Sequence, residues 1–474
     1  MSTLIPKYES PGSSTVNRPF NLKLQESVSV MDFIPIGTNT ATTDVSSYIQ
    51  AAHNYIVSTS KSGTLLFPAG TYKCNSGLII NCGYVSCLGE RAVLDFSSIG
   101  DVPAITFTGG NLIAGNPWNQ ADFAFQGFTV SGPGPTTGVG FYLNEKTTGN
   151  MSGPAHTMFR DFKIEGFKTG IYFGNHSYLC FFDHFDIWNA TTGIWFPIND
   201  LAGNAITDAG ENITFYNGTI YGTTLYDFYC ENTLSYSDFA FFACSFDGSG
   251  DAQVYNNSGT ITFTGCHFEG SAKRAIYNAT TSGIITLING YMIDNGDKSL
   301  SGYIYNTGYM SIYGGRIVSY DRSGIVYSTQ RLACIGTHFQ TNQATQNQIV
   351  ATGSSYNYWI PNQGDLNISG AVYSGAVYSG VLGGKQPIYT LSTLNTWVSL
   401  GYGTRNGLYL FRDTTSGGVS AYLADSTMGA VAISNNINGF EMNFGGVSGQ
   451  MSIRVTYGTV PRNISMTFVQ VTPG

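Results

Sequence analysis

One ten-residue stretch decides the fold. Residues 261–270 read Ile-Thr-Phe-Thr-Gly-Cys-His-Phe-Glu-Gly, with apolar side chains at the first, third, sixth and eighth places. The pattern recurs every 22–26 residues, in copies that begin at Ile213, Phe239, Ile261, Ile285, Met310 and Leu332. Looser copies begin at Phe123, Thr157 and Cys180. A repeat of this length is typical of a solenoid, in which each unit buries its apolar face against the next.

The spacing inside the repeat predicts two strands joined by a corner. The first and third places point to the same side of a strand, whereas the step from the third to the sixth place breaks this alternation. The fifth place holds small or turn-forming residues, namely Asn217, Ala243, Gly265, Asn289, Gly314 and Gly336. A third strand is expected at residues 171–173, 194–196, 254–256, 276–278, 304–306 and 326–328. The sequence therefore predicts an all-β fold, a right-handed parallel β-helix with three strands per coil.

The composition supports this fold class and excludes several partners. The chain has 474 residues and 59 glycines, and only 11% of its residues are charged, which disfavours helical bundles. The net charge of -8 argues against nucleic acid and against an anionic membrane surface as partners. No apolar run is long enough for a membrane span.

The eight cysteines are expected to be free and buried. Cys244 and Cys266 occupy one inward column, and Cys180, Cys230 and Cys334 also fall at inward places of the repeat. Small thiols that fill a buried stack explain these positions better than disulfides do. No CxxC pair or His–Cys cluster is present, so neither a metal nor a cofactor is expected.

Four segments follow from changes in pattern along the chain. Residues 1–27 are polar and are expected to be an attachment segment, and residues 28–365 form the β-helix. A helix over 44–57, with Asp44 as its N-cap, is expected to cover the open end of the solenoid. Residues 366–386 contain a tandem Gly-Ala-Val-Tyr-Ser duplication and are expected to be a linker or stem. Longer alternating strands over 387–474 predict an antiparallel β-sandwich.

The order of motifs near the N-terminus resembles a known family. Residues 28–33 read VSVMDF as an expected strand, residues 46–56 read SSYIQAAHNYI as a helix, and residues 63–72 read GTLLFPAGTY as a strand. This order resembles the start of bacteriophage tailspike proteins, capsular polysaccharide depolymerases with a pectate-lyase-like right-handed β-helix. The chain departs from the family pattern at residues 34–36 and 46–47.

The resemblance implies a function and a place of action as well as a fold. It implies a parallel homotrimer that binds and cleaves a bacterial capsular polysaccharide or O-antigen at the host cell surface. It also implies a virion protein, attached through its N-terminus to the phage tail or to another tailspike. Synthesis in the host cytoplasm fits the lack of a signal-peptide pattern. The resemblance further implies that the C-terminal segment promotes trimerisation or binds carbohydrate.

Outward places of the repeat carry the candidate chemistry. Neighbouring coils lie about 4.8 Å apart, so Asp247 and Glu269, both at ninth places, should lie one above the other, with His267 beside Glu269. Two close carboxylates raise the pKa of one of them, which yields an acid and a base for glycoside hydrolysis. The expected catalytic residues of an endo-glycosidase are therefore Asp247, Glu269 and His267. The expected substrate-binding residues on the same face are Glu165, Asp186, Trp188, Tyr221, Tyr291 and Arg316.

Two alternatives stay open at this point. A polysaccharide lyase would use His267 or Tyr291 as the base and Arg316 to neutralise a uronate, with His338 one coil further on. A receptor-binding module without catalysis would keep its aromatic columns, and the loss of Asp247 or Glu269 would not matter to it.

The third strand has columns of its own. Its outward column is expected to hold Tyr172, Trp195, Tyr229, Tyr255, Tyr277, Tyr305 and Tyr327. Packing against a neighbouring subunit is the favoured interpretation of this column, and a sugar-binding ladder is the alternative. Asn256, Asn278 and Asn306 should form an inward amide ladder. Residues 197–212 lengthen one repeat and are expected to form a surface loop, either as the wall of a groove or as a neutral length variant.

Overall fold

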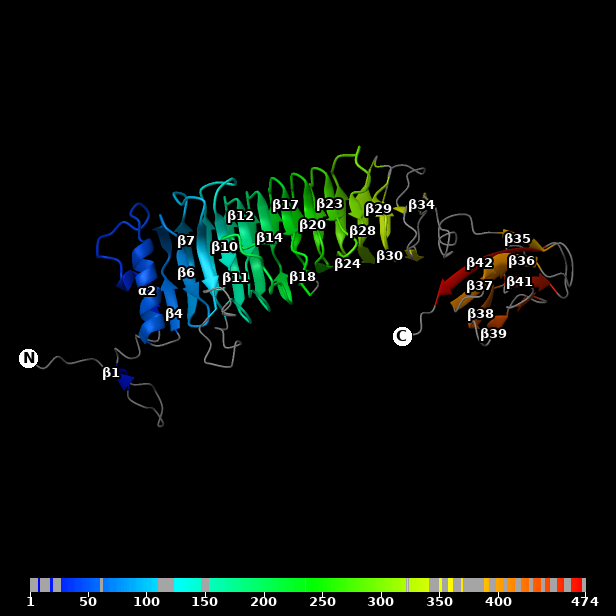
Figure 1. Cartoon of the computed structure of the whole chain (residues 1–474), viewed down its shortest axis with the longest axis horizontal. Coiled ribbons are helices and arrows are strands. Elements are labelled where there is room, and N and C mark those ends of the chain that lie inside the picture. The colour runs from blue at the N-terminus through cyan, green and yellow to red at the C-terminus, as the bar shows by residue number, and fades with distance from the viewer. Residues whose placement is uncertain are drawn as a thin grey trace, which may run out of the picture.

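The structure is a computed structural model. It describes residues 27–350 except 60–62, 110–122, 146–152, 235, 321, 323 and 341–348, together with the backbone of the strands outside this range. Strands stack coil upon coil from the helix α2 (Ser46–Thr59) onward, as Figure 1 shows. Within this described part, no helix is long and apolar enough to cross a membrane.

The third strands of the coils form a 12-stranded parallel sheet. Its strands are β6 (Leu78–Asn81), β8 (Pro103–Thr108), β10 (Val139–Leu143), β12 (Thr169–Phe173), β14 (Thr192–Phe196), β17 (Tyr226–Cys230), β20 (Ala252–Asn256), β23 (Arg274–Asn278), β26 (Ile304–Asn306), β29 (Val326–Ser328), β32 (Ile349–Ala351) and β34 (Ile368–Ser369). The expected third strands are confirmed. Pairing continues to Ser369, past the expected end of the β-helix at residue 365.

The first and second strands of each coil form two further parallel ladders. In the early coils one bent strand covers both positions, in β7 (Val85–Asp95), β9 (Phe125–Ser131), β11 (Met158–Glu165) and β13 (Phe181–Trp188). Later coils divide it into β15 (Ile213–Tyr216) and β16 (Thr219–Tyr221), β18 (Asp238–Phe242) and β19 (Ser245–Asp247), β21 (Thr260–Thr264) and β22 (His267–Glu269), β24 (Ile284–Ile288) and β25 (Tyr291–Asp294), β27 (Tyr309–Tyr313) and β28 (Arg316–Ser319), and β30 (Leu332–Ile335) and β31 (His338–Gln340). The expected parallel β-helix with three strands per coil is therefore confirmed.

The corner between the first and second strands requires left-handed backbone. Asn217, Ala243 and Asn289 have φ values of 49°, 51° and 51°, and the glycines at the same place of other coils also have positive φ. Asparagine and glycine tolerate this region best, because other side chains clash there. The fifth place of the repeat is thus a corner, as its residue types predicted.

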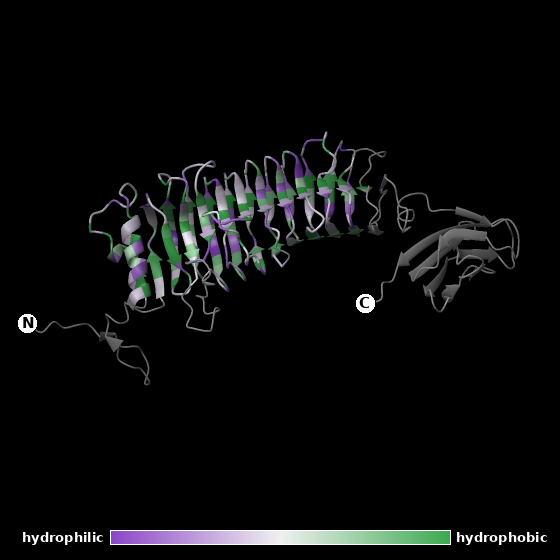
Figure 2. Ribbon diagram, viewed as in Figure 1, coloured by the Kyte–Doolittle hydropathy of each residue, from purple (hydrophilic) through white to green (hydrophobic). Residues whose placement is uncertain are grey.

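The core is a series of aromatic and aliphatic columns. Phe215 stacks on Phe182 and on Phe241 with ring centroids 4.7 and 4.6 Å apart, and Phe246 stacks on Phe268 at 4.8 Å. Apolar residues recur along the strands of successive coils (Figure 2). Because strands in a parallel stack are held in register, each ring lies over its counterpart, which adds about 0.5–1.5 kcal/mol per pair beyond burial.

The expected amide ladder is present inside the third-strand sheet. Asn256 Nδ2 donates to Asn278 Oδ1 at 3.0 Å, Asn278 Nδ2 donates to Asn306 Oδ1 at 2.8 Å, and Asn306 Nδ2 donates to Ser328 Oγ at 2.9 Å. These side chains are fully buried. Each coil is therefore fixed to the next by side-chain as well as backbone hydrogen bonds, which matters because a buried amide without a partner is costly.

Helix α2 packs its apolar face on the first coils, as expected. Val45, Ile49, Ala52 and Ile56 are buried in the core. The helix begins at Ser46 and not at residue 44, although the Asp44 carboxylate still accepts a hydrogen bond from the Ser46 backbone N–H at 3.1 Å. The expected helix boundaries of 44–57 are therefore off by two residues at each end.

The expected strand over residues 28–33 is wrong in its second half. β3 (Ser27–Ser29) ends early, and a 3-10 turn, η1 (Val30–Asp32), follows it. Ser29 Oγ accepts from Met31 N–H, and Asp32 Oδ2 accepts from Ser29 N–H, both at 3.2 Å. This reciprocal capping box satisfies backbone donors that a continuing strand would have paired, so the chain turns. The stretch at 63–72 forms two strands, β4 (Gly63–Phe67) and β5 (Gly70–Lys73).

All eight cysteines are free and buried. Beyond the coils, β35 (Ile388–Leu391), β37 (Gly407–Asp413), β38 (Val419–Asp425), β39 (Gly429–Asn435) and β42 (Arg462–Gln470) form one sheet, and β36 (Val398–Gly403), β40 (Phe440–Asn443) and β41 (Gln450–Val455) form another. Their pairings are antiparallel, as expected. The duplication at 370–379 lies outside the described residues, as does most of the expected stem over 366–386 and of the expected attachment segment over 1–27.

Candidate functional site

The outward side chains of the second strands form one continuous band. In the ninth-place column, backbone register pairs Glu165 with Trp188, Trp188 with Tyr221, Tyr221 with Asp247, and Asp247 with Glu269. The seventh-place column runs beside it through Lys163, Asp186, Thr219, Ser245, His267, Tyr291, Arg316 and His338. The structure thus brings every predicted site residue onto one face, each at the register position that the repeat predicted.

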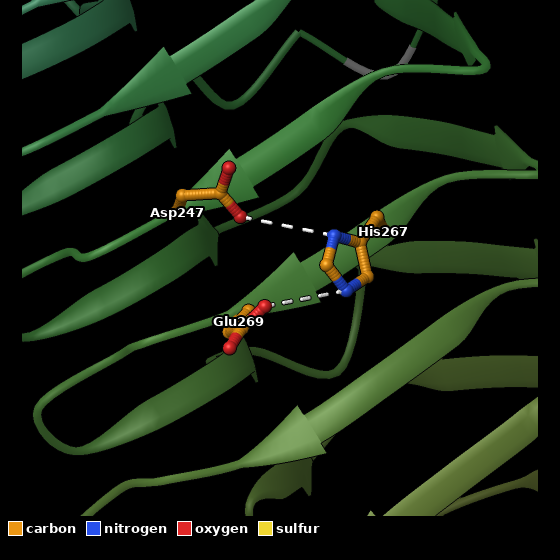
Figure 3. A group of neighbouring side chains, drawn as sticks. All are labelled: Asp247, His267 and Glu269. Atoms are coloured by element: carbon orange, nitrogen blue, oxygen red, sulfur yellow. Dashed lines mark ion pairs between the residues drawn. The ribbon is translucent and has the colours of Figure 1, made fainter.

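Three of these side chains converge at β19 and β22. His267 Nδ1 lies 3.9 Å from Asp247 Oδ1, and His267 Nε2 lies 3.6 Å from Glu269 Oε2 (Figure 3). One acidic oxygen of Asp247, one of Glu269 and one His267 nitrogen all lie within 4.8 Å of one another. The imidazole contacts the two carboxylates through different nitrogens. This arrangement bridges the two carboxylates, and one imidazole nitrogen with two carboxylate oxygens is also a set of ligands that could hold a metal ion.

The two carboxylates have different environments. Burial raises the pKa of Asp247, the Glu269 charge raises it further, and the hydrogen bond from Ser245 Oγ, at 3.0 Å from Asp247 Oδ2, opposes the shift. Asp247 Oδ1 is buried and accepts no hydrogen bond from the described residues. Glu269 is more exposed, with 46% of its side chain accessible against 37% for Asp247. Burial is therefore the larger cause of the raised Asp247 pKa. Repulsion from the Glu269 charge, which the sequence predicted, is the smaller cause.

Two buried polar residues lie beneath this pair, and the repeat pattern did not identify them. The Gln253 amide nitrogen donates to the Phe246 carbonyl and, at 2.6 Å, to the Glu269 carbonyl. Asp227 is fully buried and accepts from Thr223 Oγ1 at 2.8 Å. Burial raises the pKa of Asp227 well above its ordinary value, which favours the neutral carboxyl. The signal in the sequence is a polar residue directly before an inward-facing apolar residue of the third strand, Asp227 before Phe228 and Gln253 before Val254.

An aromatic platform lies beside the acidic pair, toward the N-terminus. The Trp188 and Tyr221 rings stack with centroids 5.8 Å apart and planes 13° from parallel. Lys163 Nζ lies 4.9 Å from the Trp188 ring centre and pairs with Glu165 Oε2 at 2.6 Å. Glu165 also accepts from Ser131 Oγ at 2.8 Å. Glu165 is thus held by neighbours within the band, and Trp188 stays 41% exposed although Tyr221 stacks on its ring and Lys163 lies over it.

The residues on the other side of the pair also stack. The His267 and Tyr291 rings are 5.3 Å apart and 11° from parallel, and the Arg316 guanidinium lies 5.8 Å from the Tyr291 ring centre. Arg316 additionally donates to Gln340. His267, Tyr291 and Arg316, which the lyase alternative requires, are therefore contiguous. The Arg316 guanidinium, however, is turned toward Tyr291 and Gln340.

The aromatic column of the third strand is present and longer than predicted. Register pairs Tyr142 with Tyr172 and continues the expected column to Tyr327. The loop at 197–212 covers its first members, because Tyr172 OH donates to Asn199 O at 2.7 Å and Leu201 N–H donates to Tyr142 OH at 3.4 Å. The predicted surface loop thus folds over this column, on a different sheet from the acidic pair.

Comparison with known proteins gives similarity in fold alone. No protein-family model and no curated protein sequence matches the chain. The solved gp42 tailspike of Acinetobacter phage vb_AbaP_AS12 is 12% identical, with a TM-score of 0.51, over 94% of this chain and 82% of that one.

Two further structures are similar at a lower level. A variant of the tailspike protein of E. coli bacteriophage HK620, in complex with a pentasaccharide, is 12% identical with a TM-score of 0.47, over 98% of this chain and 97% of that one. DFA-IIIase from Arthrobacter chlorophenolicus A6, in complex with GF2, is 9% identical with a TM-score of 0.44, over 75% of this chain and all of that one. By its likeness to the gp42 tailspike, the chain has the parallel β-helix fold of a phage tailspike, as the resemblance of residues 28–72 implied.

Proposed function

We propose that this protein is a phage tailspike that depolymerises a bacterial surface polysaccharide, a capsule or an O-antigen, by hydrolysing glycosidic bonds. The observation that carries the proposal is the Asp247–Glu269 pair, held in register on adjacent coils beside the Trp188–Tyr221 platform. Glycoside hydrolysis uses a pair of carboxyls, and the aromatic rings beside them offer apolar surface to a sugar. The tailspike fold adds support, because it presents such a band along an exposed wall.

The environments of the two carboxyls assign their roles. Asp247, whose pKa is raised by burial, holds the proton and donates it to the leaving glycosidic oxygen. Glu269 is the nucleophile that attacks the anomeric carbon, and water then releases the sugar with Asp247 acting as base. The acidic oxygens lie within 4.8 Å, close to the separation of about 5–5.5 Å found in retaining enzymes and shorter than the roughly 6.5–9.5 Å of inverting ones.

His267 positions the pair. It lies between the two carboxylates and is braced by the Tyr291 ring. An imidazole at this place stabilises the negative charge of Glu269 before the attack, and that of Asp247 after its proton has passed to the leaving oxygen. Asp186, Tyr291 and Arg316 extend the binding surface along the band in both directions.

The decisive experiment compares oligosaccharide release from a panel of bacterial capsules. We expect Asp247→Asn and Glu269→Gln each to lower the rate by about 10²–10⁴-fold while polysaccharide binding persists. Asp238→Asn is the matched control, because it makes the same change on the outer face of a first strand, at the register position of Thr260. Unchanged release by both site variants would remove the pair from the mechanism.

The same measurement separates the alternatives. Products with a conjugated unsaturated uronate at the new end, formed by the two variants as well, would identify a lyase that uses His267, Tyr291 and Arg316. Retained binding with no product from the wild-type protein would leave a receptor-binding module.

We propose that the protein assembles as a homotrimer on the phage tail, attached through residues 1–27. The outward aromatic column of the third strand supports contact between copies, because its rings form an apolar strip along the sheet. Tyr255→Ser combined with Tyr277→Ser should convert trimer to monomer in sedimentation velocity. A trimer of undiminished stability would exclude this column from the interface.

A further inference from the structure

A cleft of about 320 Å³ opens in the same outer band, on the N-terminal side of the aromatic platform. Its lining includes Arg91, Gly127, Asp161, Lys163, His184 and Asp186. The volume lies at the lower end of the range of about 300–1,000 Å³ for small-ligand pockets. Asp186 is two coils before Asp247 in the band, so the cleft lies on the same wall as the acidic pair.

Gly127 interrupts the column of corner side chains at the cleft. Backbone pairing places Gly127 next to Asp161, and Asp161 next to His184, at the corners of successive coils. Gly127 has a φ of +84°, and a Cβ on it would approach the Gly89 carbonyl oxygen to 2.1 Å. Glycine is therefore required there, because the Gly89 backbone occupies the place that a side chain would need, and the corner between Arg91 and Asp161 carries no side chain into the cleft.

One wall of the cleft is held rigidly. The Asp161 carboxylate accepts from His184 Nδ1 at 2.8 Å, from Gln126 Nε2 at 3.1 Å and from Arg160 Nε at 3.3 Å. A carboxylate only accepts hydrogen bonds, so His184 Nδ1 donates its proton to Asp161, and Nε2 is the ring nitrogen left for a ligand. His184 Nε2 has no partner among the described residues, and 75% of the side chain is exposed. This nitrogen is placed to form a hydrogen bond with a ligand hydroxyl.

The charges of the lining divide into neutralised and free groups. Lys163 is paired with Glu165, and Asp161 is paired with Arg160 and His184. Arg91 is exposed and has no ion-pair partner in the part of the chain that the structure describes. Arg91 therefore leaves a free guanidinium at one end of the cleft, whereas Asp186 lies at the other end, three coils away or about 14 Å. A ligand anion belongs at the Arg91 end, because a guanidinium matches a carboxylate in two parallel hydrogen bonds.

We propose that this cleft is a subsite for an acidic sugar chain, with Arg91 binding the carboxylate of a hexuronate unit and His184, three coils further on, forming a hydrogen bond with a hydroxyl of the neighbouring unit. The inference rests on the proposed function for the identity of the ligand as a sugar, and it does not depend on the acidic pair. It narrows the substrate class to polysaccharides that carry uronate. Lys163 connects the subsite to the platform, since it lines the cleft and lies over the Trp188 ring.

Binding of sodium glucuronate, with glucose as the neutral match, tests the subsite on the full chain by saturation-transfer NMR. We expect glucuronate to bind more tightly than glucose, Arg91→Gln to weaken glucuronate binding about tenfold or more, and added salt to weaken it too. Arg274→Gln is the control, because it removes a guanidinium that lies over Tyr277 and Tyr305, on the third-strand sheet, and should change nothing.

Each outcome bears on one proposal. No glucuronate binding, equal binding of glucose, or glucuronate binding that is insensitive to Arg91→Gln would overturn the subsite. Binding that depends on Arg91, in a protein that depolymerises no capsule, would overturn the hydrolase and leave the subsite in place.

Discussion

The Trp188 indole stacks on the Tyr221 ring one coil further on, with centroids 5.8 Å apart. Tyr221 is in turn the register partner of Asp247. The platform and the acidic pair are therefore consecutive steps of a single column. A sugar chain that lies along this column would present one unit to the rings and a neighbouring linkage to the carboxyls.

Removal of the platform should weaken substrate binding more than it slows the chemical step. We expect Trp188→Ala to raise KM about tenfold with little change in kcat, because a lost stacking surface affects substrate and transition state alike. Steady-state kinetics on the susceptible capsule measure both constants. Trp195→Ala, on the third-strand sheet, is the control, and an equal effect of both substitutions would contradict a local role for Trp188.

The pH dependence should report the proton on Asp247. Because burial raises the pKa of Asp247, a step that needs its protonated form slows as pH rises through that raised pKa. The hydrogen bond from Ser245 lowers the same pKa, so Ser245→Ala should move the basic limb of the pH–rate profile upward. The control is Ser311→Ala on a first strand. If the basic limb of the Ser245→Ala profile moved to lower pH, or did not move, Asp247 would be excluded as the acid.

The buried carboxyl of Asp227 should make stability depend on pH. Its folded pKa is raised by burial, so its contribution is intact below its ordinary pKa of 3.8 and declines as pH rises toward the folded value. Each unit of elevation costs about 1.4 kcal/mol at high pH. Asp227→Asn should therefore stabilise the protein at pH 7 and change little at pH 3.5, as urea unfolding at the two pH values measures. An asparagine variant that is less stable at pH 7 would show that the carboxyl is ionised.

The amide ladder should contribute to stability at each rung. Asn278→Ala removes the partner of Asn256 and of Asn306 together and should cost about 1–3 kcal/mol, the usual penalty for a buried polar group left unpaired. Asn295→Ala, at an exposed position near the same coil, should change the free energy of unfolding by less than about 0.5 kcal/mol. Equal losses of stability in the two variants would mean that the ladder does not stabilise the stacking of the coils.

The buried ion pair of Arg322 and Asp294 gives a stronger prediction. Both side chains are fully inaccessible, and Arg322 Nη2 donates to Asp294 Oδ1 at 3.0 Å. Arg322→Met would leave the Asp294 charge buried without its main partner, and we expect a loss of about 3–5 kcal/mol. Thermal unfolding of this variant and of the double variant with Asp294→Leu checks the cause, because the double variant should recover part of the loss.

Much of the fold follows from the repeat because its pattern encodes register directly. A residue at the ninth place of one coil must lie over the ninth place of the next, which is why the adjacency of Asp247 and Glu269 was predictable. The same logic predicted the Asn256–Asn278–Asn306 ladder and the third-strand aromatic column. Whether Asp247 and Glu269 are catalytic stays a prediction, because register fixes where a side chain lies and not what it does.

Other features depend on contacts that no repeat encodes. The end of β3 at Ser29 is set by a reciprocal bond with Asp32 and not by hydrophobic alternation. The loop at 197–212 folds onto Tyr142 and Tyr172 through hydrogen bonds between its backbone and the two tyrosine hydroxyls. No motif in the loop sequence predicts these bonds. The cleft at Gly127 lies at a corner where the Gly89 backbone excludes any side chain, and a pattern of apolar places treats this position as an ordinary corner.

The fixed spacing of the coils makes the wall a molecular ruler. Asp186 at the cleft and Asp247 are two rungs apart, and one rung is about 4.8 Å. A uronate held by Arg91, three coils before Asp186, would therefore set which linkage reaches the carboxyls, and so the length of the fragments that are released. Duplication or deletion of one whole coil between the cleft and the acidic pair would lengthen or shorten those fragments in discrete steps. The cleft and the acidic pair would each keep their own geometry.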